Sequence, residues 1–309
     1  MIFTQNLCKK YGRFTAVQQL NLNVHKGTVL GLVGENGAGK TTTLSMLATL
    51  STPTSGKAYI NGFEVTKEPA EVRRSIGFMP DSFGVYDDLT VEEYLRFYAD
   101  CYHVPDGLIR CRQDDLLARV NLIEKRQTYV NALSRGMQQR LEIARCLMHD
   151  PEVLILDEPS AGLDPRSRIE LRNVLHQLRN LGKTILVSSH ILHELAEFAD
   201  EIGILRRGEL ATVAAVGVML SHTAAYRSLW LTGNVVPAKW DRIFRDDKHV
   251  IDISYEQGGV SVLYAGTTEQ QSELLRSCIE AGLQLSQFTE RPTDIESLFL
   301  RLTESEVHS

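Results

Sequence analysis

The chain has 309 residues, which is enough for one large and one smaller domain, each with its own core. Its hydrophobic content of 43% and charged content of 23% are ordinary for a soluble globular protein. The formal net charge of −6 gives no support to a nucleic-acid partner, which usually needs a basic face, so none is expected. The five cysteines are scattered without a CxxC pair, which argues against a zinc site or a disulfide framework.

The sequence contains no apolar run of the roughly 18 residues that a membrane-spanning helix needs. The N-terminal segment MIFTQNLCKKYG reaches polar and basic residues too early for a signal peptide. If the protein acts at a membrane, we therefore expect another polypeptide to supply the spanning part.

Three apolar segments predict the strands of a parallel sheet. Residues 28–33 (TVLGLV), 153–156 (VLIL) and 184–188 (TILVS) are apolar almost throughout, as is typical of strands buried on both faces. Leucine and valine residues at helical spacing over 171–181 predict a helix between the last two strands, which gives a βαβ unit. Residues 18–26 alternate apolar and polar side chains, which predicts one half-buried antiparallel strand.

A helical region is expected to interrupt this sheet. Thr90 and Glu93 have the spacing of a capping box, and apolar side chains at helical spacing follow them. Helical patterns continue to about His149, so we expect an all-helical insert over residues 90–149.

The pattern changes again after Gly217. The remaining residues predict the order β-α-β-β-α-β, with Gln257-Gly258-Gly259 as a hairpin turn and residues 294–302 as a last helix. We therefore expect two domains, residues 1–217 and residues 218–309, the second a small α+β module of the ferredoxin-like kind.

The segment GENGAGKTT matches the phosphate-binding pattern G-x-x-x-x-G-K-[ST], between a buried strand and a helix. Its glycines allow backbone conformations that turn N–H groups toward phosphate oxygens, and the helix start adds partial positive charge. Lys40 is expected to bridge the β- and γ-phosphates and the Thr41 hydroxyl to bind Mg²⁺. A glycine-rich turn that matches by chance is the alternative. The expected nucleotide contacts are Gly34, Asn36, Gly37, Ala38, Gly39, Lys40, Thr41 and Thr42.

The segment VLILDEP places two acids at the end of an apolar strand. Asp157 is expected to hold the Mg²⁺ shell, and Glu158 to polarise the attacking water. The alternative is a pair of acids that merely opens a loop. Together with the P-loop, the two acids predict a nucleoside triphosphatase.

The segment LSRGMQQR (residues 133–140) lies just upstream of these acids and resembles the LSGGQ signature of ABC ATPases. Tyr11 lies where that family has an aromatic residue that stacks on adenine. Residues 160–164 (SAGLD) resemble its D-loop, and His190 fits its switch histidine, which contacts the γ-phosphate. On these motifs and their order, the first domain resembles an ABC transporter ATP-binding subunit. The resemblance implies an α/β P-loop NTPase cassette with an antiparallel β subdomain and a helical subdomain.

The same resemblance implies that two copies of the chain pair head to tail around Mg²⁺ and ATP. Ser134 and Gly136 of one copy would contact the γ-phosphate that the other copy holds, and Asp164 would join the nucleotide contacts. Lys40, Glu158 and His190 are the expected catalytic residues. The implied partner is a separate transmembrane permease. The implied location is cytoplasmic, peripheral on the inner face of the cell membrane.

Three positions depart from the family pattern. Arg135 stands where the signature usually has Gly, and Met137 where it has Gln. The Arg135 side chain either adds charge at the nucleotide or is simply solvated. Asp81 stands where the Q-loop glutamine is expected; being shorter, it would reach Mg²⁺ only through water or after loop movement. The alternative is a Pro-Asp turn with no role at the nucleotide.

The segment IGFMPDSFGVYDDLT, followed by LSRGM, looks like the cassettes of ABC-2-type exporters, and the C-terminal segment is similar to their small accessory domain. A rival hypothesis is a soluble ABC-type ATPase that acts on the ribosome or on nucleic acid. The single cassette, without a long heptad run, argues against it. A second rival is a nucleotide-gated binding module without turnover, which the presence of Glu158 disfavours.

Overall fold

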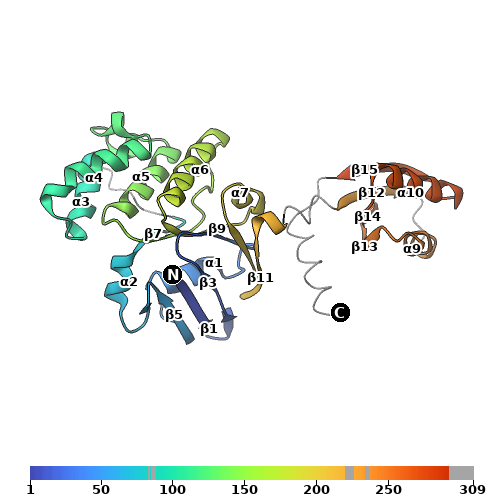
Figure 1. The fold of residues 1–309 in the computed structure, drawn as a ribbon, viewed down its shortest axis with the longest axis horizontal. Helices are drawn as coiled ribbons and strands as arrows, with labels where there is room; N and C mark the ends of the chain where they lie inside the picture. Colours follow the sequence, from blue (N-terminus) through green and yellow to red (C-terminus); the bar gives the residue numbers. More distant parts are fainter. Residues whose placement is uncertain (83, 85–87, 220–225, 234–236, 292–309) are drawn as a thin grey trace. The chain divides into compact units, whose positions relative to one another are not determined.

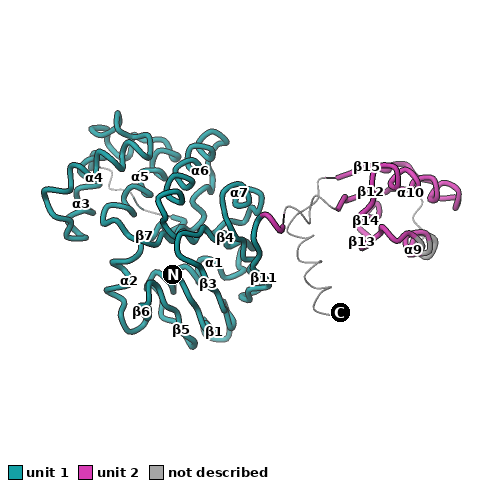
Figure 2. Tube along the Cα trace, viewed as in Figure 1, with its two compact units in different colours: residues 1–216 teal, residues 217–309 magenta. Residues whose placement is uncertain are grey.

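The computed structural model describes residues 1–82, 84, 88–219, 226–233 and 237–291 (Figure 1). The chain divides into two compact units, Met1–Val216 (unit 1) and Gly217–Ser309 (unit 2), each with a hydrophobic core of its own (Figure 2). The helix expected over residues 294–302 lies outside the described residues.

A six-stranded sheet in the order β11-β10-β4-β9-β8-β7 forms the centre of unit 1. Every neighbouring pair is parallel except β10 and β11. All residues of β4, β8 and β9 are buried, as expected for strands that are covered on both faces, whereas the edge strand β11 alternates exposed and half-buried positions. The strands are β4 (Val29–Val33), β7 (Ile76–Met79), β8 (Val153–Leu156), β9 (Thr184–Ser189), β10 (Glu201–Arg206) and β11 (Glu209–Ala215).

Four helices connect or flank these strands. They are α1 (Lys40–Leu47), α2 (Pro69–Ser75), α6 (Pro165–Asn180) and α7 (Leu192–Ala196). In α6, Leu171, Val174, Leu175 and Leu178 are buried, at the helical spacing that the sequence pattern predicted. The order β8, α6, β9 with parallel pairing is the predicted βαβ unit.

A second, antiparallel sheet of unit 1 has the path β2-β1-β5-β6, with β3 paired to β1. The single strand predicted over residues 18–26 is wrong, because the chain is extended only in two shorter pieces. Gln19, inside β2, has a φ of 46° in the left-handed region, and the register of the pairing with β1 shifts here, between Val17 and Leu20. The strands are β1 (Ile2–Tyr11), β2 (Phe14–Leu20), β3 (Asn23–Val24), β5 (Ser55–Ile60) and β6 (Phe63–Glu64).

Three longer helices form the helical part of unit 1, on the side away from the antiparallel sheet (Figure 1). They are α3 (Val91–Cys101), α4 (Asp106–Arg119) and α5 (Arg135–Leu147), with single 3₁₀ turns at Ile123–Lys125 and Val130–Ala132. The predicted capping box at the start of α3 is present: the Thr90 hydroxyl accepts from Glu93 N, and the Glu93 carboxylate accepts from Thr90 N.

A buried polar network ties these helices to the parallel sheet. The Tyr94 hydroxyl of α3 donates to the Glu142 carboxylate of α5, which also pairs with Arg145 at 2.8 Å. Arg145 in turn donates to the carbonyl oxygen of Phe78 in β7 at 2.8 Å. Because Glu142 is only 2% exposed, its charge depends on these partners. The helical part is therefore attached to the strand that leads to Asp81.

Unit 2 contains a four-stranded antiparallel sheet in the order β13-β14-β12-β15. The element order β-α-β-β-α-β with this pairing is the split βαβ arrangement. Its core includes the fully buried Trp240, Phe244 and Tyr264. The elements are β12 (Arg227–Gly233), α9 (Pro237–Asp246), β13 (Val250–Glu256), β14 (Gly259–Tyr264), α10 (Thr268–Glu280) and β15 (Leu285–Arg291).

Candidate active site

The candidate active site lies where the parallel strands of unit 1 end. Parallel strands all present their carboxyl ends at the same edge of the sheet, so loops that are distant in sequence meet there. Gly34 follows β4, Asp81 follows β7, Asp157 follows β8 and His190 follows β9. The strand pairing β4·β9·β8·β7 makes these four loops neighbours.

The loop between β4 and α1 has the backbone shape of a phosphate cradle. Gly37 and Gly39 have φ values of 85° and 106°, which side chains with a Cβ rarely adopt. A Cβ on Gly39 would also lie 2.5 Å from the carbonyl oxygen of Ala16, so only glycine fits there. Alternating left-handed residues turn successive N–H groups into one concavity, and α1 begins directly after it.

Lys40 is buried at the floor of this loop, with 6% of its surface exposed. Its ammonium donates to the carbonyl oxygen of Gly34 at 2.5 Å and lies 3.3 Å from Glu158 Oε1. The second carboxylate oxygen of Glu158 lies 2.8 Å from His190 Nδ1. One carboxylate therefore connects the P-loop lysine and the histidine that follows β9.

Asp157 lies beneath this group, with 1% of its surface exposed. The Ser188 hydroxyl donates to Asp157 Oδ1 at 2.6 Å, and the Thr41 hydroxyl also hydrogen-bonds the carboxylate. Burial raises the pKa of Asp157 above its ordinary value, whereas the two hydroxyl hydrogen bonds act in the opposite direction. The Ser188 hydroxyl also accepts a hydrogen bond from Glu158 N at 2.9 Å.

A cavity of about 340 Å³ opens over these groups, a size typical of small-molecule sites. It brings together nine of the expected site residues, namely Asn36, Gly37, Gly39, Lys40, Thr41, Thr42, Asp81, Glu158 and His190. Four further residues that the sequence reasoning missed also line it: Phe14, Ala16, Glu35 and Ala161. Phe14 follows the hairpin turn after Tyr11 and is 63% exposed, so its ring is available to a ligand.

Asp81 is one of the lining residues, so the Pro80-Asp81 segment lies at the cavity. The loop that carries it is anchored by the hydrogen bond from Asp157 N to the carbonyl oxygen of Met79 at 2.8 Å. Asp81 therefore faces the same space as Lys40 and Glu158.

Other expected residues do not line the cavity. Tyr11 is 52% exposed and lies directly opposite Phe14 in the β1–β2 pairing. Ser134 is the N-cap of α5 and accepts from Met137 N at 3.3 Å. Asp164 is the N-cap of α6, where its carboxylate accepts from Arg166 N and Ser167 N. Gly34, Ala38 and Gly136 are likewise outside the lining of this cavity.

The signature segment packs against the D-loop of the same chain. A Cβ on Gly136 would lie 2.4 Å from Ser167 Oγ, so this glycine permits α5 to approach α6 closely. The Arg135 guanidinium lies over Gly162: a Cβ there would be 2.7 Å from its central carbon. Arg135 is exposed and does not line the P-loop cavity of its own chain, and the residue beneath its guanidinium, Gly162, has a φ of 69°.

The oxygen donors of the site suit Mg²⁺, a hard cation that usually combines one or two carboxylates with phosphate oxygens. Thr41 and Asp157 are hydrogen-bonded to each other, and Asp81 faces the same cavity. Within the described ranges, no group of three or more His, Cys, Asp or Glu side chains is arranged to hold a metal by itself.

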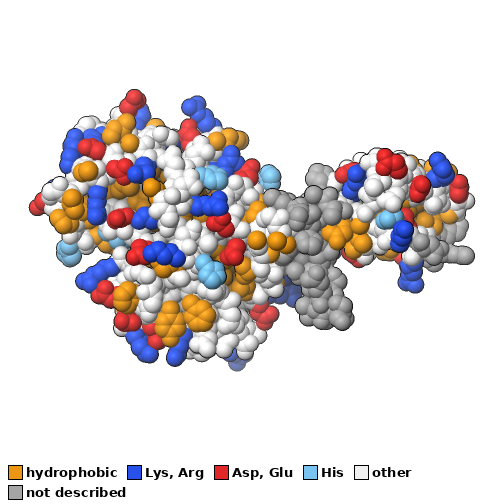
Figure 3. Space-filling view, viewed as in Figure 1, with side chains coloured by type: hydrophobic (Ala, Val, Ile, Leu, Met, Phe, Trp, Pro, Cys, Tyr) orange, Lys and Arg blue, Asp and Glu red, His pale blue; other side chains and the backbone are white. Residues whose placement is uncertain are grey.

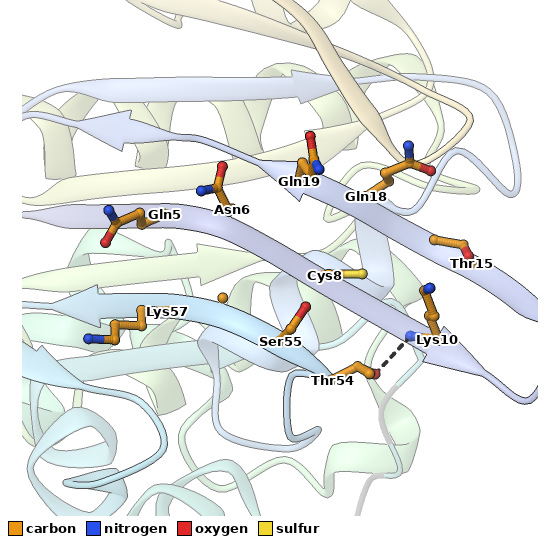
Figure 4. A pocket seen from close by; sticks show the side chains of 11 residues that line it. Gln5, Asn6, Cys8, Lys10, Thr15, Gln18, Gln19, Thr54, Ser55 and Lys57 are labelled. Atoms are coloured by element: carbon orange, nitrogen blue, oxygen red, sulfur yellow. Dashed lines mark hydrogen bonds between the residues drawn. The ribbon is translucent and has the colours of Figure 1, made fainter.

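A larger cavity, about 890 Å³, lies over β1, β2 and the start of β5 (Figure 4). Amide, hydroxyl and lysine side chains line it, and Lys10 N donates to Thr54 Oγ1 at 2.9 Å. None of the expected site residues contributes to this cavity, so the candidate active site is the smaller one at the P-loop. Among the helices of the described residues, none is long and apolar enough to span a membrane.

Comparison with known proteins supports this assignment. A family model described as "ABC transporter" matches residues 17–161. The bacitracin transport ATP-binding protein BcrA of Bacillus licheniformis is 36% identical over 308 residues, covering 98% of this chain and 97% of BcrA. The Nod factor export ATP-binding protein I of Ralstonia nicotianae is 32% identical over 309 residues, covering 99% of this chain and 95% of that protein.

Among solved structures, a dimeric ATP-binding cassette in a post-hydrolysis state bound to ADP and Pi has a TM-score of 0.64 and 28% sequence identity. The match covers 70% of this chain and 99% of that structure. The predicted fold class is confirmed, and the chain is an ATP-binding ATPase. From the P-loop geometry, the facing acids and the similarity over nearly the whole length, it follows that this chain belongs to the family of ABC transporter ATP-binding proteins.

Proposed function

We propose that this chain powers an exporter whose permease is a separate polypeptide, and that two copies of it close head to tail around Mg²⁺ and ATP. The observation that carries the proposal is the meeting of Lys40, Glu158 and His190 in one cavity that the signature segment does not line. A cassette built in this way holds the triphosphate but lacks one side of the nucleotide site.

The P-loop residues bind and orient the triphosphate. Backbone N–H groups between Gly34 and Lys40 surround the phosphate oxygens, and the Lys40 ammonium exchanges Glu158 for the β- and γ-phosphates. A Mg²⁺ ion held by Thr41 and Asp157, with Asp81 reaching it through water, would neutralise charge on the phosphates. Once Lys40 turns to phosphate, the Glu158 carboxylate is free to polarise a water, while His190 contacts the γ-phosphate.

The base of the nucleotide would stack on an aromatic side chain at the β1–β2 turn. The family resemblance assigns this role to Tyr11. Because Phe14 lines the cavity, we propose that its ring also contributes to stacking on the base. Stacking on either ring needs an exposed face, and both rings have one.

The dimer proposal follows from the place of the signature. Ser134 caps α5 on an exposed turn, a helix start where partial positive charge is available to a phosphate, and Asp164 caps α6 with its carboxylate. Because neither residue lines the cavity of its own chain, we assign them to the nucleotide held by the second copy. ATP would then stabilise the closed pair, and its hydrolysis would let the pair open.

Export and the permease partner are proposed from the relatives. One is named for bacitracin transport and another for Nod factor export. A chain of this kind would work on the cytoplasmic face of the cell membrane, attached through the permease. The rival role at the ribosome or on nucleic acid has less support: on the face in Figure 3, basic and acidic side chains are interspersed over unit 1 and form no basic stripe.

The decisive experiment uses Glu158→Gln, which keeps the shape of the side chain but cannot polarise water. With saturating Mg-ATP we expect this variant to form a dimer that gel filtration resolves, while the Lys40→Ala/Glu158→Gln double variant stays monomeric. A monomer of Glu158→Gln at saturating Mg-ATP would contradict the head-to-tail model. Co-purification of a permease from detergent-solubilised membranes tests the export proposal; recovery with ribosomes or DNA would favour the rival.

A further inference from the structure

We propose that Ser188 is a positioning residue for ATP hydrolysis, because its single hydroxyl holds the Asp157 side chain and the Glu158 backbone in one arrangement. The inference rests on the proposed roles of these two acids. Ser188 itself does not line the cavity, so it would act through them and not on the nucleotide.

The direction of both hydrogen bonds is determined by chemistry. Glu158 N is a backbone donor, so the Ser188 oxygen accepts at 2.9 Å. The ionised Asp157 carboxylate can only accept, so the one hydroxyl proton goes to Oδ1 at 2.6 Å. Ser188 is fully buried and Asp157 is 1% exposed, so the bond between them lies in the interior, whereas the bond from Glu158 N is partly buried. Removing the hydroxyl would leave a partly buried donor and a buried carboxylate without this partner.

The backbone of Glu158 needs such a support. Its φ of 47° lies in the left-handed region, which a residue with a Cβ adopts only when its surroundings hold it there. This conformation directs the carboxylate to Lys40 on one side and His190 on the other. The hydrogen bond from Glu158 N to Ser188 fixes the residue at its amide, next to the strained torsion angle.

Ser188 also connects the two acids to the histidine loop. It belongs to β9, two residues before His190, whereas the acids follow the neighbouring strand β8. One hydroxyl thus sets the separation between the metal-binding carboxylate and the residue that polarises water. Displacement of a catalytic group by about 1 Å can lower a rate about 100-fold. Loss of the Ser188 hydrogen bonds should therefore lower kcat more than it weakens ATP binding.

The chain contains a matched control in the same strand. Thr184 begins β9, is also fully buried, and accepts a hydrogen bond from Gly27 N at 2.9 Å. Its hydroxyl therefore resembles that of Ser188 in burial and in accepting a backbone N–H, but it contacts neither acid. Thr184→Val removes this hydroxyl at nearly constant volume.

The test compares steady-state ATP hydrolysis by the full-length protein and three variants. For Ser188→Ala we expect kcat to fall at least about tenfold with KM for ATP within about threefold, because the P-loop contacts are untouched. Ser188→Thr restores the hydroxyl and should recover most of kcat, and Thr184→Val should stay within about threefold of the parent. A Ser188→Ala enzyme with the parental kcat would overturn the proposal.

Two further measurements separate positioning from loss of fold and from failure of the proposed roles. ADP binding in EDTA depends on the P-loop, so Ser188→Ala should bind ADP like the parent. Amide exchange of the peptide over residues 157–161, without nucleotide, should be faster in Ser188→Ala than in Thr184→Val; equal exchange would also overturn the proposal. If Glu158→Gln retained full turnover, the catalytic role proposed for Glu158 would be wrong. If Glu158→Gln lost turnover while Ser188→Ala retained it, the positioning role proposed for Ser188 would be wrong.

Discussion

The two units of the chain are built on sheets of opposite kind. In unit 1 the strands β4, β7, β8 and β9 run parallel, so the loops that follow them meet at one edge. In unit 2 each strand is antiparallel to its neighbours, so consecutive strands end at opposite edges. Lys40, Asp157, Glu158 and His190 occupy the common edge in unit 1. In the described part of unit 2, polar side chains instead pair between neighbouring elements, for example Thr232 of β12 with Ser286 of β15 at 2.7 Å.

This difference shows how topology decides where chemistry can be assembled. Parallel strands bring together side chains that are more than a hundred residues apart, and β4, β8 and β9, which lead to these side chains, are buried on both faces. The antiparallel sheet of unit 2 also packs on an apolar core, around Trp240 and Phe244, but its strands do not all end at one edge. Unit 2 is thus expected to affect the stability of the chain, not the chemical step.

The largest expected effect is on catalysis in unit 1. Lys40→Ala removes the cation that contacts the phosphates, so we expect kcat/KM for ATP to fall roughly 100-fold or more. The matched change Lys248→Ala removes an exposed lysine of unit 2 and should leave the rate unchanged. Phosphate release by both variants is the measurement. An equal loss of kcat/KM in Lys40→Ala and Lys248→Ala would contradict the expectation that only unit 1 contributes to the chemical step.

The second effect is on the stability of unit 1. Glu142→Ala leaves the buried Arg145 without its carboxylate partner, which should cost about 3–5 kcal/mol of unfolding free energy. Both tryptophans, Trp230 and Trp240, belong to unit 2, so urea unfolding followed by tryptophan fluorescence reports on unit 2 and circular dichroism on the whole chain. The circular dichroism transition should shift, and the fluorescence transition should not. Asp115→Ala, which breaks only an exposed pair, is the control.

The third effect is a pH dependence that belongs to unit 1. Burial lowers the pKa of His149 from its ordinary value near 6.5 to about 4, although its hydrogen bond to the Ile76 carbonyl opposes this. Between these values the unfolded chain binds a proton that the folded chain does not, so stability falls as the pH falls. We expect a loss of about 2 kcal/mol from pH 7 to pH 4.5. His149→Gln should reduce this slope in urea titrations at the two pH values; an unchanged slope would exclude His149 as its source.

The smallest effect compares the two units directly. Thr90 begins α3 in unit 1 and Thr267 begins α10 in unit 2, each with a complete capping box. Replacing either threonine by alanine should cost about 1 kcal/mol, because the local physics of a helix start is the same in both. Thr267→Ala should shift the fluorescence transition and Thr90→Ala only the circular dichroism transition. A shift of the fluorescence transition by Thr90→Ala would mean that the units do not unfold separately.

Features that depend on neighbouring residues were predictable from the sequence. The P-loop pattern, the buried strands and the capping box at Thr90 are local, and the structure has them where the patterns place them. The place of Asp81 at the cavity was expected from the family resemblance, which sets it at the Q-loop position, and not from a strand pattern.

Features that depend on contacts between distant segments were not predictable. Ser188 is 30 residues from Glu158, and only the strand pairing reveals that its hydroxyl reaches both acids. A polar residue at the end of an otherwise apolar strand was the available signal. The wall position of Phe14 and the left-handed bend at Gln19 depend on the path of the β1–β2 hairpin. No pattern of single residues encodes that path.

The contact between Arg135 and Gly162 has a consequence for how this sequence can change over time. The φ of 69° at Gly162 disfavours any residue with a Cβ, whereas the Arg135 guanidinium is the end of a flexible, exposed side chain and can move aside. Position 162 should therefore keep its glycine whichever residue stands at position 135. Position 135 can change without a compensating change at position 162.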